Sequence, residues 1–274
     1  MSEEATNNNT VKTWFRNHIT VFALIFILLI SFLLKTVLLI HDSTVSRDGC
    51  YYLILASQWY EKGNWEDVLS IMQDFQMPLL LFMIKNIMKF GISAETAGFG
   101  INLVLGAMTP LFAYAIAYEL VRDQKVSLFS ALLFAVIPSA NAFSIEIQRD
   151  TLYLFWIGAV MWMLCAGIRK PEALYWMAAG VFLGFSMLTR YESAEFLIII
   201  FASIVILCLY KQFPWKKGLC LLCYSYMSCF VCIIVLCLLM GIHSNSICNF
   251  YKDYFGDKEA IFERSFDNME HIVE

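Results

Sequence analysis

Three groups of charged residues stand beside long apolar runs of this sequence, and each group mixes acidic with basic side chains. The groups are Arg47 with Asp48, Glu146 with Arg149 and Asp150, and Arg190 with Glu192 and Glu195. A carboxylate such as Asp48 can serve as a general base. The rigid guanidinium fork of Arg149 or Arg190 matches the oxygens of a phosphate. These residue types predict a site that holds a lipid phosphate headgroup and removes a proton.

The same residues also allow a purely structural interpretation. Asp48 at the start of a helix would cap free backbone N–H groups. Each arginine could form an ion pair with a neighbouring carboxylate, and the ends of membrane helices need charged residues where they meet water. The sequence leaves both interpretations open.

Motifs for nucleotides, metals and hydrolytic nucleophiles are absent. The sequence has no Gly-Lys-Ser/Thr phosphate loop, no G-x-S-x-G turn and no paired histidines. Most of the nine cysteines lie inside apolar runs, which is typical of packing thiols rather than disulfides. Cys220 and Cys223 have C-x-x-C spacing without a second pair, so the residues themselves predict no metal site.

The composition places these residues in a membrane protein. Of the 274 residues, 60% are hydrophobic and 15% are charged, against about 45–50% and about 25% in soluble domains. The net charge is −4, without a basic stripe that would neutralise nucleic-acid phosphates. Disordered proteins, nucleic-acid binders and ordinary cytosolic enzymes are thereby excluded.

The apolar runs predict an all-α fold, a polytopic membrane helical bundle with about seven spans of roughly 20 residues each. The expected spans are 19–40, 96–120, 126–143, 151–168, 174–188, 194–210 and 218–242. The shorter run 79–90 contains Lys85 and Lys89 and is expected to lie in the interface instead. Lys35 is expected to extend outward from the end of the first span.

The distribution of basic residues predicts the orientation. Alternate short loops carry Arg122 with Lys125, Arg169 with Lys170, and Lys211 with Lys216 and Lys217. The positive-inside rule then places the N-terminal segment 1–18 in the cytoplasm of a multi-pass cell-membrane protein. Residues 19–242 form the membrane domain, 41–95 the long first external loop with interfacial helices, and 243–274 an external tail.

Several segments, spread over about 19–210, resemble the GT-C glycosyltransferases. The first runs through Arg47-Asp48-Gly49, Tyr51-Tyr52, Ala56, Trp59, Gly63 and Trp65 to Pro78-Leu79-Leu80. The others are Gln148-Arg149-Asp150-Thr151-Leu152 and the G-x-x-x-G-x-x-x-L-T-R-x-E pattern from Gly180 to Glu192. They are most similar to dolichyl-phosphate-mannose protein mannosyltransferases (family 39) and the lipid A aminoarabinose transferase.

The resemblance implies a GT-C-like fold and an inverting transfer on the external face. The donor would be a polyprenyl-phosphate-linked sugar, the acceptor a lipid, glycan or protein, and a divalent metal an optional cofactor. Asp48 takes the position that acts on the acceptor in relatives, whereas many relatives carry a second acidic residue where Gly49 stands here. We expect Arg190 and Arg149 to hold the donor phosphate, with Asp150 and Glu192 orienting the arginines.

Two alternatives remain at this level. The chain could be a partial or inactive GT-C member, because relatives are longer and add further spans. It could also be a non-catalytic, transporter-like protein, which would favour charged residues within the spans around a midplane cavity. The enzyme interpretation requires Asp48, Asp150 and Arg190 to meet at one external cavity.

Overall fold

A computed structural model describes the backbone of residues 2–41, 45–72 and 77–242, with side chains described from residue 19 onward. Its described residues form twelve α-helices and one 3-10 helix. The helices are α1 (Ser2–His41), α2 (Arg47–Lys62), α3 (Trp65–Leu69), α4 (Leu79–Met88), α5 (Ala94–Met108), α6 (Pro110–Val121), α7 (Gln124–Val136), α8 (Pro138–Ser144), α9 (Arg149–Arg169), α10 (Ala173–Met187), η1 (Tyr191–Ala194), α11 (Glu195–Leu209) and α12 (Trp215–Met240). The predicted tail 243–274 lies outside the described residues.

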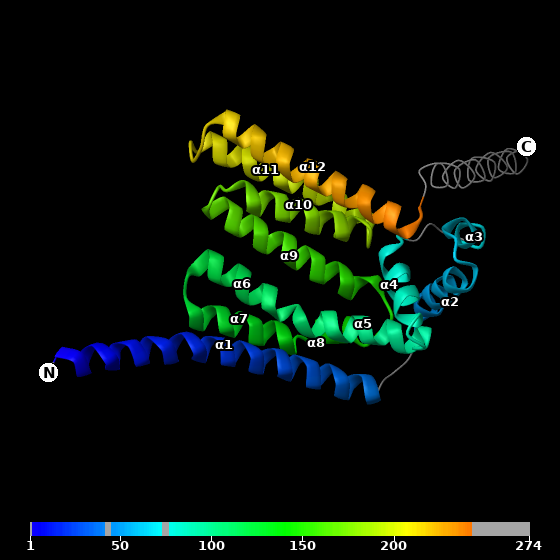
Figure 1. The fold of residues 1–274 in the computed structure, drawn as a ribbon, viewed down its shortest axis with the longest axis horizontal. Helices are drawn as coiled ribbons and strands as arrows, with labels where there is room; N and C mark the ends of the chain where they lie inside the picture. The colour runs from blue at the N-terminus through cyan, green and yellow to red at the C-terminus, as the bar shows by residue number, and fades with distance from the viewer. Residues whose placement is uncertain (1, 42–44, 73–76, 243–274) are drawn as a thin grey trace, which may run out of the picture.

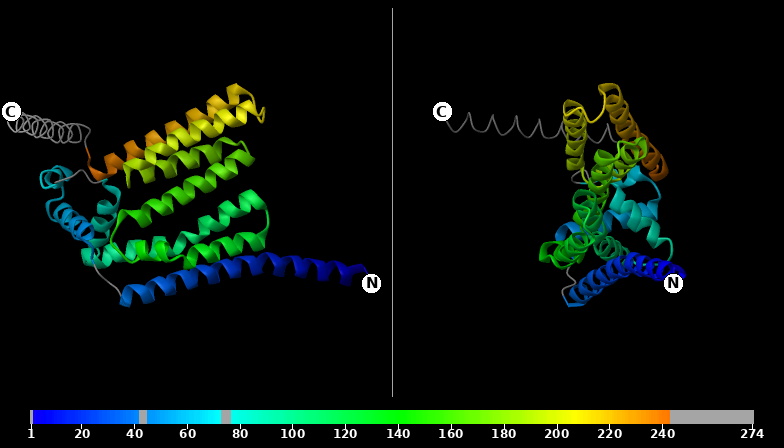
Figure 2. Two further views of the ribbon diagram at one scale, coloured as in Figure 1. Left: turned by 180° about the vertical axis from the view of Figure 1, so that it is seen from behind. Right: turned by 90° about the vertical axis from the view of Figure 1, so that its left-hand side faces the viewer.

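The long helices lie side by side, and α2, α3 and α4 gather at one end of them (Figures 1 and 2). This α2–α4 end also holds the α8–α9 and α10–α11 junctions. The α6–α7, α9–α10 and α11–α12 turns lie at the opposite end, which we call the basic end because those turns carry the basic loop residues. The chain reverses direction at each of these turns and junctions, so the alternation read from the sequence is reproduced in space.

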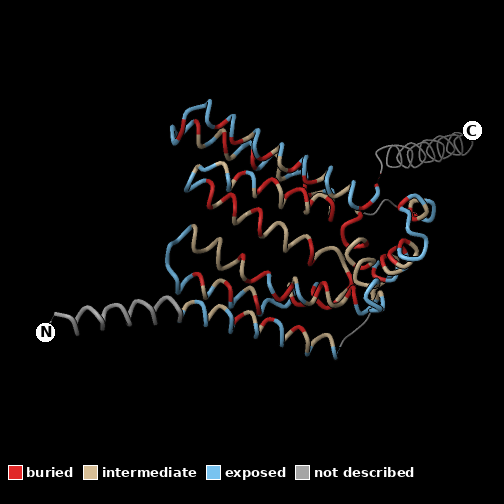
Figure 3. Tube along the Cα trace, in the orientation of Figure 1, coloured by how far each residue is buried: buried red, intermediate tan, exposed pale blue. Residues whose placement is uncertain are grey.

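The described residues include five helices that are long and apolar enough to cross a membrane: 19–41, 94–121, 149–169, 191–209 and 215–240. The α7–α8 pair would be a sixth span, broken by a bend of 57°. The chain is therefore a multi-pass membrane protein of helical-bundle architecture. Large apolar side chains on the outer faces of α1, α11 and α12 are exposed, as lipid contact requires (Figure 3).

The expected span at 174–188 runs from the basic end to the α2–α4 end of the bundle, but it is short for a membrane span. Its helix, α10, has 15 residues and rises ~22 Å, which is shorter than a bilayer core of about 30 Å. Pro171 lies before the helix and the extended backbone of Arg190 lies after it, so the helix cannot lengthen at either end. Segment 79–90, by contrast, contains only the ten-residue α4, in agreement with its exclusion from the spans.

Two prolines shape the spans as their backbone chemistry dictates. Pro110 takes the first position of α6, where a missing N–H leaves no helical bond unmade, and α5 with α6 counts as one span. Pro138 starts α8 after Ile137 leaves the helical conformation, and the chain bends there. The bend turns α8 toward the start of α9.

Lys35 does not extend outward as the sequence analysis expected. The side chain is 1% exposed. Its ammonium donates hydrogen bonds to Ser31 Oγ at 2.9 Å and to Asn141 Oδ1 of α8 at 2.7 Å. Because the bend at Pro138 places Asn141 inside the protein as an acceptor, Lys35 links α1 to α8 and does not reach the lipid headgroups.

The described parts of the predicted loop 41–95, residues 45–72 and 77–93, fold into a small helical cap. Helix α2 ends at Gly63, whose φ of 81° is a left-handed conformation that glycine adopts without strain. Its buried face, with Leu55 and Trp59, packs with Trp65 of α3 and Ile84 of α4 into one core. That core continues into the bundle, so the cap and the membrane helices form a continuous packed unit (Figure 3).

Candidate functional site

Asp48 lies in the first turn of α2, at the α2–α4 end of the bundle. The residue that caps α2 is Ser46, whose Oγ accepts a hydrogen bond from the backbone N–H of Gly49 at 3.1 Å. Asp48 is exposed. The capping role that the sequence allowed for Asp48 is therefore filled by Ser46, and the carboxylate is available for another purpose.

Gly49 marks a close approach between α2 and the loop before α9. A Cβ added to Gly49 would lie 3.1 Å from the carbonyl oxygen of Ile147 and 3.0 Å from Cγ1 of Val45. Ile147 itself is fully buried. On the other side, the buried Asn102 of α5 donates hydrogen bonds to the carbonyl oxygens of Glu146 and Gln148. The loop that leads to Arg149 is thus held between two helices.

Arg149 lies against Tyr52, one turn after Asp48 on α2. The guanidinium carbon is 5.4 Å from the centre of the Tyr52 ring. Burial raises the pKa of Tyr52, Arg149 lowers it in part, and the nearby charge of Asp48 raises it further. Within the described residues no carboxylate lies at ion-pair distance from Arg149. The positive charge of Arg149 is therefore not neutralised by a direct ion pair there.

Arg190 is held by two carboxylates from different elements. It pairs with Asp150 in the first turn of α9 and with Glu192 of η1, where Nη2 lies 2.9 Å from Oε1 and Nε 3.4 Å from Oε2. The ring of Tyr153 has its centre 5.5 Å from the guanidinium carbon. Hydrogen bonding to Glu192, together with the charges of both carboxylates, raises the pKa of Arg190. The guanidinium stays charged and fixed in orientation.

The described residues around this ion pair enclose a cavity of about 210 Å³. Its lining comes from α8, α9 and the α10–α11 junction: Phe143, Asp150, Tyr153, Leu154, Arg190 and Glu192. We call this space the charged pocket. Thr151 of α9 holds α8 against the start of α9, because its Oγ1 donates a 2.7 Å hydrogen bond to the carbonyl oxygen of Phe143. The lining contains one guanidinium and two carboxylates, so an anion that enters the pocket must displace a carboxylate from Arg190.

The segments that carry the GT-C resemblance meet in space. The backbone N–H of Leu79 donates to the carbonyl oxygen of Leu188 at 3.0 Å, which joins the start of α4 to the turn before Arg190. Gly180 and Gly184 face α12: a Cβ would lie 2.0 Å from the Ser225 carbonyl oxygen at the first and 3.0 Å from that of Cys229 at the second. The glycines of the pattern serve helix packing, and its arginine lies in the pocket.

The structure brings Asp150, Arg190 and Glu192 together in the charged pocket, but Asp48, which was expected at the same cavity, is not among its lining residues. Arg149 lies beside the helix of Asp48 and does not line the pocket either. Other residues of the three groups do not line the pocket. Arg47 and Glu195 are exposed, and Glu146 accepts a hydrogen bond from the side chain of Gln148. Sequence reasoning named Tyr52 only within the resembling segment and did not single out Tyr52, Asn102 or Tyr153 as site residues. The aromatic pair Tyr51-Tyr52 was a visible signal, whereas nothing local marks Asn102.

A metal does not fit this arrangement. Among the described residues, no group of three His, Cys, Asp or Glu side chains could hold an ion. The two carboxylates of the charged pocket both face Arg190. The optional divalent metal of the resemblance finds no ligand set in the described part of the chain.

Comparison with known proteins adds two findings. Residues 76–236 match the family model described as dolichyl-phosphate-mannose-protein mannosyltransferase. The undecaprenyl phosphate-alpha-4-amino-4-deoxy-L-arabinose arabinosyl transferases of Pseudomonas aeruginosa (strain UCBPP-PA14) and Pseudomonas paraeruginosa (strain DSM 24068 / PA7) are each 32% identical to this chain over 93 residues. That alignment covers 32% of this chain and 17% of each relative, so the chain matches less than a fifth of their length.

Proposed function

This chain belongs to the dolichyl-phosphate-mannose-protein mannosyltransferase family, and from that premise we propose that it acts as an integral-membrane glycosyltransferase. It moves a sugar from a polyprenyl-phosphate-linked donor to an acceptor hydroxyl on a lipid, glycan or protein, with inversion at the anomeric carbon. The observation that carries the proposal is the clustering at one end of the bundle: Arg190 between Asp150 and Glu192, with Arg149 beside the helix of Asp48.

Asp48 is the general base of the proposed reaction. The acceptor oxygen attacks the anomeric carbon while its proton passes to the exposed carboxylate of Asp48. The bond from that carbon to the phosphate oxygen breaks, and its electron pair leaves with the polyprenyl phosphate. Removal of the proton by a positioned base contributes about 10²–10⁴-fold to the rate.

The two arginines have different tasks in this proposal. Arg149 supplies the charge that meets the donor phosphate, because no carboxylate pairs with it in the described part of the chain. Arg190 is already paired with Asp150 and Glu192, so the donor phosphate binds it by replacing one of these two carboxylates. Until the phosphate binds, both carboxylates hold the guanidinium in a fixed orientation. Charge that develops on the leaving phosphate is stabilised by fixed donors of this kind.

The proposed active face is external, with the N-terminus in the cytoplasm. Support comes from the location of the basic residues: Arg122, Lys125, Arg169, Lys170, Lys211, Lys216 and Lys217 all lie at or beside the turns of the basic end. The positive-inside rule assigns that end to the cytoplasm. The charged pocket and α2–α4 then face the outside.

The direct test is transfer in membranes that contain the full chain and a radiolabelled sugar on undecaprenyl phosphate. Asp48→Asn keeps the shape of the side chain but removes the base, and we expect transfer to fall about 10²–10⁴-fold. The matched control is Glu61→Gln, an exposed carboxylate at the other end of the same helix, which should leave transfer unchanged. Full transfer by Asp48→Asn would remove Asp48 from the mechanism.

A further inference from the structure

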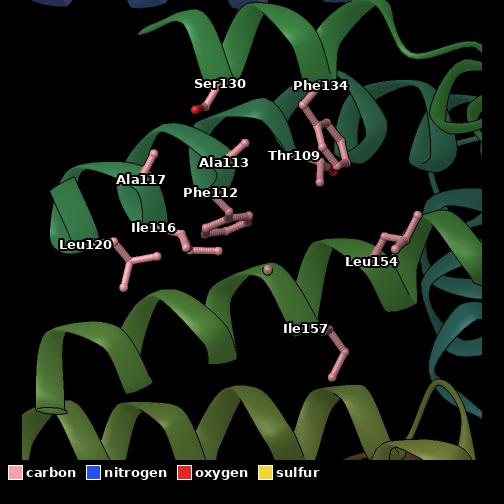
Figure 4. A pocket seen from close by; sticks show the side chains of 11 residues that line it. Thr109, Phe112, Ala113, Ile116, Ala117, Leu120, Ser130, Phe134, Leu154 and Ile157 are labelled. Carbon is pink, nitrogen blue, oxygen red and sulfur yellow. The ribbon is translucent and has the colours of Figure 1, made fainter. Parts of the chain in front are cut away.

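A second cavity lies between α6, α7 and α9 and has no role in the reaction described so far. Its volume is about 420 Å³. Figure 4 shows its lining, which comes from α6 (Phe112, Ala113, Ile116, Ala117 and Leu120), α7 (Ser130 and Phe134), α9 (Leu154, Ile157 and Gly158) and Thr109 before α6. We call it the apolar pocket. Its size is in the range of pockets that hold small molecules.

The two hydroxyl groups in the lining of the apolar pocket, those of Thr109 and Ser130, both donate their hydrogen bonds to the backbone and leave no free donor for a ligand. Thr109 Oγ1 donates to the carbonyl oxygen of Leu105 at 2.8 Å, and Ser130 Oγ donates to that of Val126 at 3.0 Å. Both groups are thus satisfied within their own stretch of chain. The remaining lining is hydrocarbon, so the pocket suits an apolar ligand and would penalise a polar one.

One face of α9 connects the apolar pocket with the charged pocket. Leu154 lines both cavities. Asp150, Leu154 and Gly158 follow one another at intervals of four residues and so share that face of the helix. Along it the surface changes from the carboxylate at the α2–α4 end to hydrocarbon deeper in the bundle. In Figure 4, Leu154 lies near Thr109 and Phe134, at the opposite end of the pocket from Leu120.

We infer that the apolar pocket binds the hydrocarbon chain of the donor lipid, next to the phosphate held by Arg149 and Arg190. The inference rests on the proposed function and adds the route of the chain: it leaves the charged pocket past Leu154, between α9 and α6. From Thr109 to Leu120 the wall of α6 extends ~16 Å, so the pocket holds the first part of a long chain. The rest lies in the surrounding lipid.

The test measures binding of a chain-length series to the purified full chain in detergent by native mass spectrometry. The probes are dimethylallyl, geranyl and farnesyl phosphate, which share a headgroup and differ in chain length. Wild-type affinity should rise along the series. Ala113→Phe, which fills the pocket, should weaken farnesyl phosphate about tenfold and dimethylallyl phosphate less than twofold, because the loss scales with the apolar area that no longer becomes buried.

Two further variants make the result specific. Ala202→Phe adds the same group on the exposed face of α11 and should leave all three affinities unchanged. Ala117→Phe lies one helical turn farther from Leu154 on α6 and should affect farnesyl phosphate alone. It also provides a second pocket variant if Ala113→Phe does not fold.

The outcomes separate this inference from the proposed function. If Arg149→Gln weakens all three probes but the pocket variants that fold leave the chain-length dependence intact, the chain binds elsewhere: the inference is overturned and the phosphate site stands. If wild-type protein binds none of the probes, both fall. Weakening that grows with chain length in a pocket variant, and not in Ala202→Phe, supports the inference.

Discussion

The two ends of the bundle both carry arginine–carboxylate pairs, yet they differ in what the pairs enclose. At the basic end, Glu119 bridges Arg122 and Arg169, and the side chains of both arginines are a third or more exposed. At the α2–α4 end, Arg190 joins Asp150 to Glu192 in the lining of a cavity, and Arg149 lies nearby without an ion pair among the described residues. The same residue types form a solvated turn at one end and a candidate site at the other.

The difference lies in the backbone that surrounds the charges. The basic end consists of short turns, with Arg122 and Lys211 in the left-handed conformation at φ of 60° and 57°. The α2–α4 end adds a helical cap, a buried loop at Ile147 and an asparagine that fixes that loop. The exposure of the ion pairs does not distinguish the two ends, because Glu119 is 18% exposed while Asp150 and Glu192 are 30% and 35% exposed. The distinction lies in the cavity that the pairs of Arg190 line and in the buried loop beside it.

Among the comparisons between the two ends, the largest expected effect comes from removing Arg149, which has no ion pair among the described residues. Arg149→Gln should reduce sugar transfer about 10²–10³-fold, as expected for the loss of one fixed donor to a developing anion. Arg169→Gln removes an arginine from the basic end and should change transfer less than twofold, since it breaks only an exposed pair. Equal losses from the two variants in the membrane transfer assay would erase the distinction between the ends.

A smaller loss of sugar transfer is expected when the positive charge of Arg190 is kept but its bidentate guanidinium is replaced. Arg190→Lys retains the cation but cannot hold Asp150 and Glu192 in the same plane, and transfer should fall about tenfold. Arg122→Lys at the basic end is the matched control and should retain full activity. An unchanged rate in Arg190→Lys would mean that the bidentate geometry has no role in transfer.

Disrupting the close contact between α2 and the loop before α9 should lower the thermal stability of the protein. Gly49→Val forces atoms into Val45 and the Ile147 carbonyl, and we expect a loss of about 1–3 kcal/mol, visible as a lower thermal midpoint in detergent. Lys211→Gly relieves a left-handed residue at the basic end and should not lower the midpoint. If Gly49→Val melts like the wild type, the loop is not clamped there.

The smallest effect concerns pH. Because burial raises the pKa of Tyr52 above its usual value of 10.0, its contribution to stability is complete below about pH 10 and is lost as the pH rises through the higher folded-state pKa. The thermal midpoint of Tyr52→Phe should therefore fall less than that of the wild type between about pH 9 and 11. Parallel curves would place the hydroxyl in water.

The membrane fold and the location of the charged groups could be predicted from the sequence because hydropathy and charge alternate along the chain. The described helices reproduce the spans, apart from α10, and the groups around Asp48, Asp150 and Arg190 lie at one end. Those properties depend on the local sequence alone. The family match over 76–236 agrees with the resemblance read from short motifs.

Individual contacts could not be predicted, because they join residues far apart in the chain. Lys35 is buried because Asn141, 106 residues later, accepts its hydrogen bond. Asn102 fixes a loop more than 40 residues away. Asp48 is free of a capping role because Ser46 has it, which depends on where the helix begins. Each of these facts requires the packing of several helices, and no spacing rule encodes them.

The most direct test of the account is binding of undecaprenyl phosphate to the purified full chain by native mass spectrometry, with the arginines removed from one end at a time. We predict that Arg149→Gln with Arg190→Gln abolishes binding, whereas Arg122→Gln with Arg169→Gln leaves it unchanged. Retained binding in the first double variant, or loss in the second alone, would contradict the assignment of the phosphate site to the α2–α4 end.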